Sequence, residues 1–305
     1  MKVLITTGLF YPSKFGGPAN TLYWLAKSLV SNKIKVSVVT SNNHIDAGLV
    51  DFDEWTEIDN IRVRYCTVKS KLSFRVIFQT IKELFKSDVV LLCSIFYIPS
   101  LFIALFASLT SKKIIWSPRG ELFYSAIDGS NSKLLYVRLL KFLFSKRVVF
   151  HATSTEERDI IHKYIGHSVK TIVIPNYMEI HEKNNRLVNV DKYFLYVGRI
   201  APIKALDNLL LGLAKSKSFM NSEYKLLIAG GVEKQFKGYY NQLIQILSEK
   251  VDLKEKVVFL GNVEGEQKFQ FYANAHYSIL VSHSENFGNV VIEALSQGTP
   301  VIASH

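Results

Sequence analysis

The 305-residue sequence is poor in cysteine, and its two cysteines, Cys66 and Cys93, stand far apart without metal-binding spacing. This excludes a disulfide framework and a Cys/His zinc site, and it is typical of a reduced, cytoplasmic protein. Glycine and proline are also few, with 16 and 7 residues, whereas 48% of the residues are hydrophobic. That composition excludes collagen-like and disordered chains, and the length predicts two globular domains.

Unbroken hydrophobic runs are scarce as well. Residues 89–111 carry no charge and are long enough to cross a bilayer, but Pro99 divides them into a strand-like run and a helix-like run. We therefore prefer a buried strand and helix to a membrane span. The apolar run after Lys2 has no small-residue cleavage site and leads into a glycine-rich turn, so it predicts a first strand rather than a signal peptide.

The rest of the chain alternates short β-rich runs with segments of helical spacing, which is the signature of parallel sheets with crossover helices. A polar stretch interrupts the alternation, and we predict a domain over residues 1–180, a linker over 181–192 and a second domain over 193–305. The fold class is α/β, with two Rossmann-like domains facing a cleft. Ligands of such sheets bind at the carboxyl ends of the strands. The strands are expected at residues 3–6, 35–40, 61–66, 89–93, 114–117, 148–152, 171–175, 193–197, 225–229, 257–260, 277–281 and 300–303.

Two of the strand ends carry residues suited to an anion. Gly16 and Gly17 follow the first strand and open a helix, where free backbone amides attract negative groups. Arg199 and Lys204 follow the first strand of the second domain, and the pair suits a diphosphate leaving group. The alternatives are an ordinary strand-to-helix turn and a solvated loop.

The most specific pattern pairs two carboxylates, Glu285 and Glu293, around a strand-to-helix turn. Glu285 is expected near the mouth of the helix and Glu293 about two turns inside it, so an eight-residue step at helical rise places the carboxylates about 12 Å apart. Because either glycosidase geometry needs a shorter separation, a hydrolytic acid/base pair is disfavoured, and the two groups suit the ends of one extended ligand. The turn amides near Phe287 and Gly288 could hold a polar group of that ligand.

Several segments, taken in order, resemble the retaining glycosyltransferases of family 4, which use nucleotide sugars and have the GT-B fold. The resemblance covers essentially the whole chain and rests on its glycine turns and on the spacing of the two glutamates. The segments are residues 16–17, 117–121, 174–176, 198–204, 226–231, 257–263, 282–288 and 293–304.

The resemblance implies a role for each matching residue. Glu285 would contact the donor sugar and Glu293 the ribose, Arg199 and Lys204 would grip the diphosphate, and Gly16 and Gly17 would close over the donor. The turn residues Asn286, Phe287 and Gly288 would meet the sugar. No metal and no cofactor is implied, since cations and helix termini take the place of divalent ions.

The resemblance also implies acceptor-side candidates and two departures. Arg119 and Glu121 stand where many relatives carry an acceptor-side histidine or acid, and His151 ends a predicted strand at the same edge. Asn286 and Ala205 replace glycines of the family pattern. The chain stops at a strand where relatives continue, so the second domain is expected to be truncated.

Positive charge gathers in the first domain, where residues 1–180 hold 23 basic and 14 acidic residues. Two segments, Lys69 to Lys86 and Lys133 to Arg147, mix five cations each with apolar residues. They resemble basic amphipathic helices that rest on anionic lipid, the alternative being solvated helices packed on the sheet. No nucleic-acid motif is present, so nucleic acid is not expected as a partner.

The function expected from these features is transfer of a sugar, with retention, from a nucleotide diphosphate donor to a glycan or lipid-linked acceptor. We place it in the assembly of a polysaccharide such as O-antigen, capsule or exopolysaccharide, at the inner face of the plasma membrane. The alternatives are a nucleotide-sugar epimerase, phosphorylase or other GT-B enzyme, and a truncated, catalytically silent binding subunit.

Overall fold

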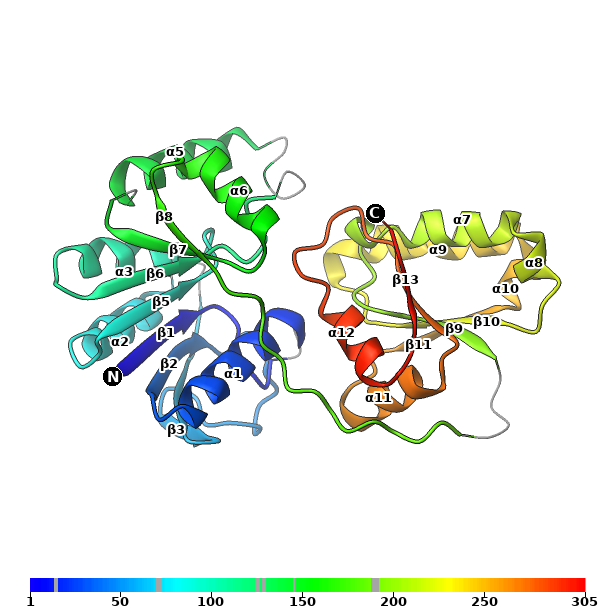
Figure 1. The fold of residues 1–305 in the computed structure, drawn as a ribbon, viewed down its shortest axis with the longest axis horizontal. Helices are drawn as coiled ribbons and strands as arrows, with labels where there is room; N and C mark the ends of the chain where they lie inside the picture. The colour runs from blue at the N-terminus through cyan, green and yellow to red at the C-terminus, as the bar shows by residue number, and fades with distance from the viewer. Residues whose placement is uncertain are drawn as a thin grey trace. The chain divides into compact units, whose positions relative to one another are not determined.

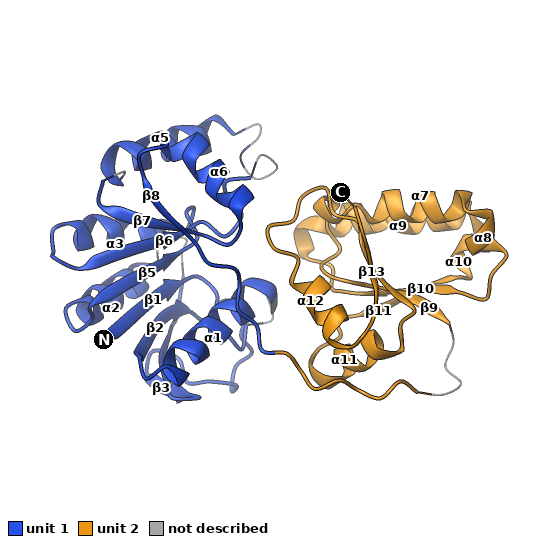
Figure 2. Ribbon diagram, viewed as in Figure 1, with its two compact units in different colours: residues 1–179 blue, residues 180–305 orange. Residues whose placement is uncertain are grey.

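The computed structural model describes residues 1–13, 16–69, 73–123, 127, 130–144, 146–187 and 192–304. The chain divides into two compact units, Met1–Glu179 and Ile180–His305, coloured blue and orange in Figure 2. Each unit is built around a sheet of its own.

The described residues of unit 1 form an eight-stranded sheet in the order β3-β4-β2-β1-β5-β6-β7-β8 (Figure 1). All neighbouring strands are parallel except β3, which pairs antiparallel with β4. The strands are β1 Lys2–Thr7, β2 Lys35–Ser41, β3 Trp55–Ile58, β4 Ile61–Cys66, β5 Val89–Cys93, β6 Lys113–Ser117, β7 Val148–Ala152 and β8 Lys170–Val173.

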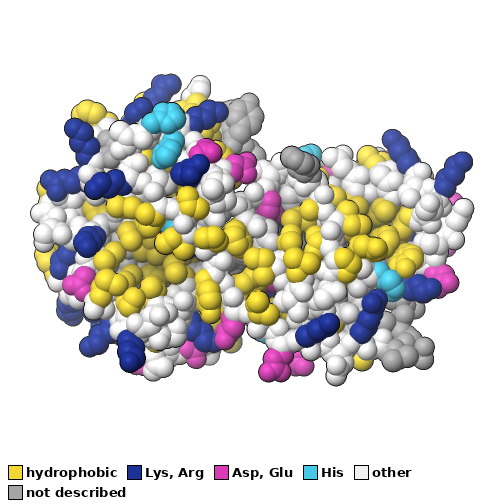
Figure 3. Space-filling model, viewed as in Figure 1, with side chains coloured by type: hydrophobic (Ala, Val, Ile, Leu, Met, Phe, Trp, Pro, Cys, Tyr) yellow, Lys and Arg dark blue, Asp and Glu magenta, His cyan; other side chains and the backbone are white. Residues whose placement is uncertain are grey.

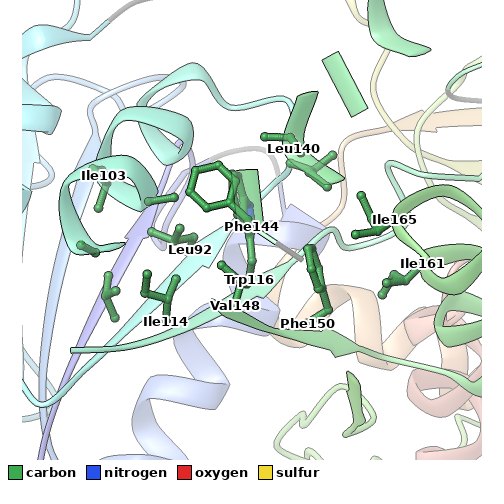
Figure 4. Packing of buried hydrophobic residues seen from close by; sticks show 14 of the residues in the cluster. Leu92, Ile103, Ile114, Trp116, Leu140, Phe144, Val148, Phe150, Ile161 and Ile165 are labelled. Atoms are coloured by element: carbon green, nitrogen blue, oxygen red, sulfur yellow. The ribbon is translucent and has the colours of Figure 1, made fainter. Parts of the chain in front are cut away.

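The helices of unit 1 lie on both faces of this sheet. The apolar sides of α2, α3, α5 and α6 share one core with the inner strands, and α1 packs on the other face over β1, β2 and β4. Figure 4 shows the first core, where Trp116 of the sheet meets Phe144 edge to face with ring centroids 5.6 Å apart. The helices are α1 Gly16–Ser31, α2 Phe74–Leu84, α3 Ile98–Ser108, α5 Asn131–Phe144 and α6 Thr155–Ile165.

Apolar side chains also gather on the outside of unit 1. On the face that Figure 3 shows, they lie over β1, β5 and β6, with lysine and arginine at the margin. Val89, Ile115 and Val149 line a hollow there, which Lys112, Lys113 and Arg147 border. No helix among the described residues has the length and apolar character that crossing a membrane requires.

Unit 2 repeats the plan with a parallel five-stranded sheet in the order β11-β10-β9-β12-β13. One face packs on α7 to α10 and the other on α11 and α12. The elements are β9 Tyr193–Val197, η1 Pro202–Lys204, α7 Leu206–Lys215, α8 Lys217–Met220, β10 Lys225–Ala229, η2 Lys234–Phe236, α9 Lys237–Glu249, α10 Val251–Lys254, β11 Val257–Gly261, α11 Gly265–Asn274, β12 Tyr277–Leu280, α12 Asn289–Ser296 and β13 Val301–Ala303.

Every predicted strand is present, with ends that differ by at most two residues. The sequence reading missed β3, because this short antiparallel edge strand is half exposed and has no clear apolar alternation. The predicted linker has no regular structure over residues 181–187, and residues 188–191 lie outside the described part. Its backbone is nevertheless anchored on unit 2, because the amides of Asn184 and Leu187 donate to side chains of Gln297 and Asn274.

Candidate functional site

The carboxyl edge of the unit 2 sheet brings together residues that lie far apart in the sequence. Lys204 lies in η1, and Glu285 lies in the loop after β12. The Lys204 ammonium donates a hydrogen bond to the Glu285 carboxylate and forms an ion pair with it. The loop is fixed by its backbone, since the amide of His283 donates to the carbonyl of Ile203 at 2.9 Å. The lysine that is expected to bind the diphosphate and the glutamate that is expected to contact the sugar therefore pair with each other.

The second predicted cation, Arg199, pairs with a different carboxylate. Its Nη1 lies 2.9 Å from Oε1 of Glu233, whose side chain is only 18% exposed. Backbone pairing of Ile200 with Val232 brings these two side chains to the same edge. A Cβ on Gly230 would stand 1.8 Å from the carbonyl oxygen of Gly198, so only glycine permits this close approach of the two segments.

Glu293 lies inside α12 and is buried. One carboxylate oxygen accepts from Lys268 at 2.7 Å and the other from the hydroxyl of Tyr272 at 3.1 Å. Because α12 begins only at Asn289, Glu285 lies outside the helix. Helical rise over all eight steps, on which the separation of about 12 Å rests, therefore does not apply, and it carries no argument against a hydrolase.

The turn after Glu285 and the first residue of α12 each carry an amide side chain whose oxygen has no donor among the described residues. Gly288 has a left-handed backbone with φ +71°, which suits glycine and lets the chain enter the helix. The Oδ1 atoms of Asn286 and Asn289 are buried and accept no hydrogen bond from the part of the chain that the structure describes. Buried acceptors of this kind suit a hydroxyl or amide donor of a ligand.

In unit 1 the carboxyl edge of the sheet carries Arg119, which follows β6. Its Nη1 donates to Oγ1 of Thr21 at 3.3 Å and to Oδ1 of Asn176 at 3.2 Å. Thr21 lies in α1, which begins at Gly16 and continues through Gly17 with no acidic residue in its first turn. The glycines and the acceptor-side arginine predicted from the sequence therefore belong to one edge of unit 1.

The other two acceptor-side candidates are engaged by the protein itself. The Glu121 carboxylate accepts from the hydroxyl of Ser94 and from the amides of Ile95 and Phe96, and burial raises its pKa against the opposing effect of these bonds. His151 must donate from Nε2 to the Ile174 carbonyl at 2.8 Å, so its Nδ1 accepts from Ser117. Burial lowers the His151 pKa and favours this neutral form.

Three charged residues at these edges were not predicted from the sequence: Glu157, Glu233 and Lys268. Glu157 lies in the first turn of α6, where the Ser154 hydroxyl accepts from its amide at 3.1 Å and caps the helix. Its carboxylate additionally accepts from the amide of Gly120 at 2.6 Å. No spacing rule connects these side chains to their partners, because the contacts cross between separate elements.

The comparisons with known proteins agree with this architecture. Residues 178–305 match the model of the family described as glycosyl transferases group 1. The structure resembles that of Anabaena HepE in complex with UDP and glucose, with a TM-score of 0.77 and 17% identity, covering 99% of this chain and 80% of that chain. A sucrose-phosphate synthase from Thermosynechococcus elongatus gives a TM-score of 0.75 at 17% identity, with 99% and 81% covered. The chain therefore has the GT-B fold of two Rossmann-like units, and its residues 178–305 are similar to the group 1 glycosyl transferases.

Sequence relatives point to the same class. A D-inositol 3-phosphate glycosyltransferase from Mycolicibacterium smegmatis is 31% identical over 157 residues, which are 52% of this chain and 34% of that protein. An uncharacterized glycosyltransferase from Methanocaldococcus jannaschii is 33% identical over 114 residues, or 37% of this chain and 27% of that protein. The matched part thus spans about a third or less of each of these relatives.

Proposed function

We propose that the protein is a retaining glycosyltransferase that uses a nucleotide diphosphate sugar, without a metal or other cofactor. The observation that carries the proposal is the Lys204–Glu285 contact at the carboxyl edge of the sheet in the part of the chain that is similar to the group 1 glycosyl transferases. Lys204 and Arg199 would bind and neutralise the departing diphosphate, and Glu285 would contact the transferred sugar. Glu293, held by Lys268 and Tyr272, would accept hydrogen bonds from the ribose.

The donor proposal rests on the chemistry of the turn as well. Asn286, Phe287 and Gly288 border a helix start, and the unused Oδ1 of Asn286 suits a sugar hydroxyl. A uridine nucleotide is the first donor to test, because the HepE structure with the same fold is a complex with UDP and glucose. The proposed acceptor is a glycan or lipid-linked oligosaccharide in polysaccharide assembly.

Replacement of Glu285 tests the transfer reaction. The wild-type protein should release nucleoside diphosphate from one member of a nucleotide-sugar panel, and Glu285→Ala should lower that rate by about 100-fold or more. Glu264→Ala, at the start of α11 in the same unit, is the control and should retain the rate. Equal rates for Glu285→Ala and wild type would refute the assignment, and epimerised donor formed without any acceptor would indicate an epimerase.

We also propose that unit 1 docks on an anionic membrane, at the inner face of the plasma membrane. The helices α2, α3 and α5 pack on one core, so their outer sides lie on the same side of the unit. Each carries an exposed apolar ridge, and exposed cations lie beside the ridges of α2 and α5, among them Lys82, Lys86 and Arg138. Residues 70–72 and 145 of the two predicted basic segments lie outside the described part. The ridges consist of Phe74, Phe78, Phe85, Ile98, Phe102, Leu105, Phe106, Leu109, Leu135, Leu139 and Phe142.

Vesicle sedimentation tests this docking. Wild type should pellet with vesicles containing anionic lipid and much less with neutral ones, since each surface cation contributes about 1 kcal/mol. The double variant Phe78→Glu, Phe142→Glu should stay in the supernatant. The control is Leu211→Glu, an exposed position on α7 of unit 2, which should pellet like wild type. Equal pelleting of the double variant would contradict the proposal.

A further inference from the structure

Arg119 of unit 1 is a partly buried cation without a counter-ion. Among the described residues no carboxylate lies within ion-pair distance of it, whereas Arg199, Lys204 and Lys268 each have one. Its Nη1 donates to the neutral side chains of Thr21 and Asn176, its guanidinium also interacts with the buried thiol of Cys93, and its buried Nε has no oxygen acceptor among the described residues. Because removing a guanidinium from water is costly unless an anion compensates it, the arrangement is suited to an anionic ligand.

The turn that carries Arg119 is fixed by a buried carboxylate, that of Glu157. Arg119 has a left-handed conformation with φ +52°, which is unfavourable for a residue with a long side chain. The next amide, that of Gly120, donates to Glu157 at 2.6 Å, and Glu157 is completely buried. The second oxygen of Glu157 accepts from the amide and the hydroxyl of Thr153 at 2.7 and 2.8 Å. Glu157 therefore fixes the turn that points Arg119 toward α1.

The surroundings of Arg119 favour negative charge. The first turn of α1 has no acidic residue, so its amides are not neutralised by a neighbouring carboxylate of that turn. Burial lowers the pKa of His151 and the positive charge of Arg119 lowers it further, so this histidine is neutral and adds no competing charge. Burial raises the pKa of the Cys93 thiol against the opposing effect of Arg119, so the thiol is neutral as well.

We propose that Arg119, positioned by Glu157, binds a phosphate-type oxyanion on the acceptor. The planar guanidinium matches the oxygens of a phosphate group, and Thr21 and Asn176 orient it. This inference rests on the proposed function and adds the class of acceptor, a phosphorylated molecule. The diphosphate of the donor is the other possible source of the anion, so the test must separate the two.

The test titrates inorganic phosphate, at constant ionic strength, into protein already saturated with the nucleoside diphosphate that it binds. Binding is followed by calorimetry. Wild type should bind phosphate under these conditions, Arg119→Gln should bind at least about 10-fold more weakly, and Arg119→Lys should lie between them, since lysine keeps the charge without the planar fork. Arg186→Gln, at an exposed position of unit 2, is the matched control and should bind like wild type.

Glu157→Gln separates positioning from general support of the fold. It should weaken phosphate binding several-fold while nucleoside diphosphate binding stays at the wild-type level, whereas a purely structural role would change both or neither. Phosphate binding that is independent of Arg119, or that disappears when nucleoside diphosphate saturates the protein, would overturn the inference. If no nucleoside diphosphate binds the wild type, the proposed function fails, and Arg119-dependent binding of phosphate alone would still be measurable.

Discussion

The carboxyl edges of the two sheets differ in how their cations are paired. In unit 2 the cations Arg199, Lys204 and Lys268 each contact a carboxylate. In the described part of unit 1, Arg119 contacts only neutral groups at its edge of the sheet. A ligand that binds unit 2 must exchange ion pairs that already exist, whereas an anion at Arg119 would supply charge compensation that the protein lacks. The two edges should therefore respond in opposite ways to removal of nearby charge.

The largest effect is expected at Lys204. Lys204→Ala removes the cation that would stabilise the leaving diphosphate, and loss of one such group typically costs about 100- to 1,000-fold in rate. Turnover of the nucleotide sugar should fall by that factor, and binding of inorganic pyrophosphate should weaken. The control is Lys215→Ala, an exposed lysine at the end of α7. If Lys204→Ala turned over donor at the wild-type rate, unit 2 would not be the site of leaving-group stabilisation.

An intermediate effect, of opposite sign, is expected at Glu233. This carboxylate competes with an anionic ligand for Arg199, so Glu233→Gln should raise the affinity for nucleoside diphosphate and for pyrophosphate by roughly 3- to 10-fold, which corresponds to about 0.7 to 1.4 kcal/mol. The gain should shrink as salt is added, because exposed charges are screened. The measurement is a calorimetric titration at two salt concentrations.

Glu233→Ala controls for a positioning role. If Glu233 only competes, both variants should bind more tightly than wild type. Weaker binding by Glu233→Ala, together with unchanged binding by Glu233→Gln, would show instead that the carboxylate orients Arg199. In that case the carboxylates of unit 2 would hold the cations in the orientation that binds the ligand, and would not compete with the ligand for them.

The local sequence was enough to predict the strands and the part of the site that lies next to strand ends. It was not enough for residues whose contacts lie elsewhere in the fold. Runs such as Val89–Cys93 are buried on both faces, so their apolar composition alone identifies them. Arg199, Lys204 and Glu285 were predicted because each lies within a few residues of a strand end. Glu157, Glu233 and Lys268 were not, because their importance depends on contacts across the fold. The assumption of continuous helix from Glu285 to Glu293 was wrong for a related reason, since a left-handed turn at Gly288 delays the helix to Asn289.

The smallest effect is expected at His151. Its protonation tests whether Arg119, at the edge of unit 1, has a neutral neighbour or a cationic one. Burial lowers its pKa, so between pH 7.5 and 5.5 the unfolded chain, with an ordinary pKa of about 6.5, takes up a proton that the folded state resists. The stability that neutral His151 contributes is fully present above the unfolded pKa of about 6.5. It is lost as the pH falls from that value toward the lower folded pKa. The thermal midpoint of wild type should therefore fall more on acidification than that of His151→Gln, by about 2–4 °C for each kcal/mol. Other titrating groups, including His276, remain in both proteins and cancel in the difference. An equal fall in both proteins would mean that His151 takes up a proton as readily in the folded state as in the unfolded chain, and at pH 5.5 Arg119 would then have a cationic neighbour that opposes the proposed anion site.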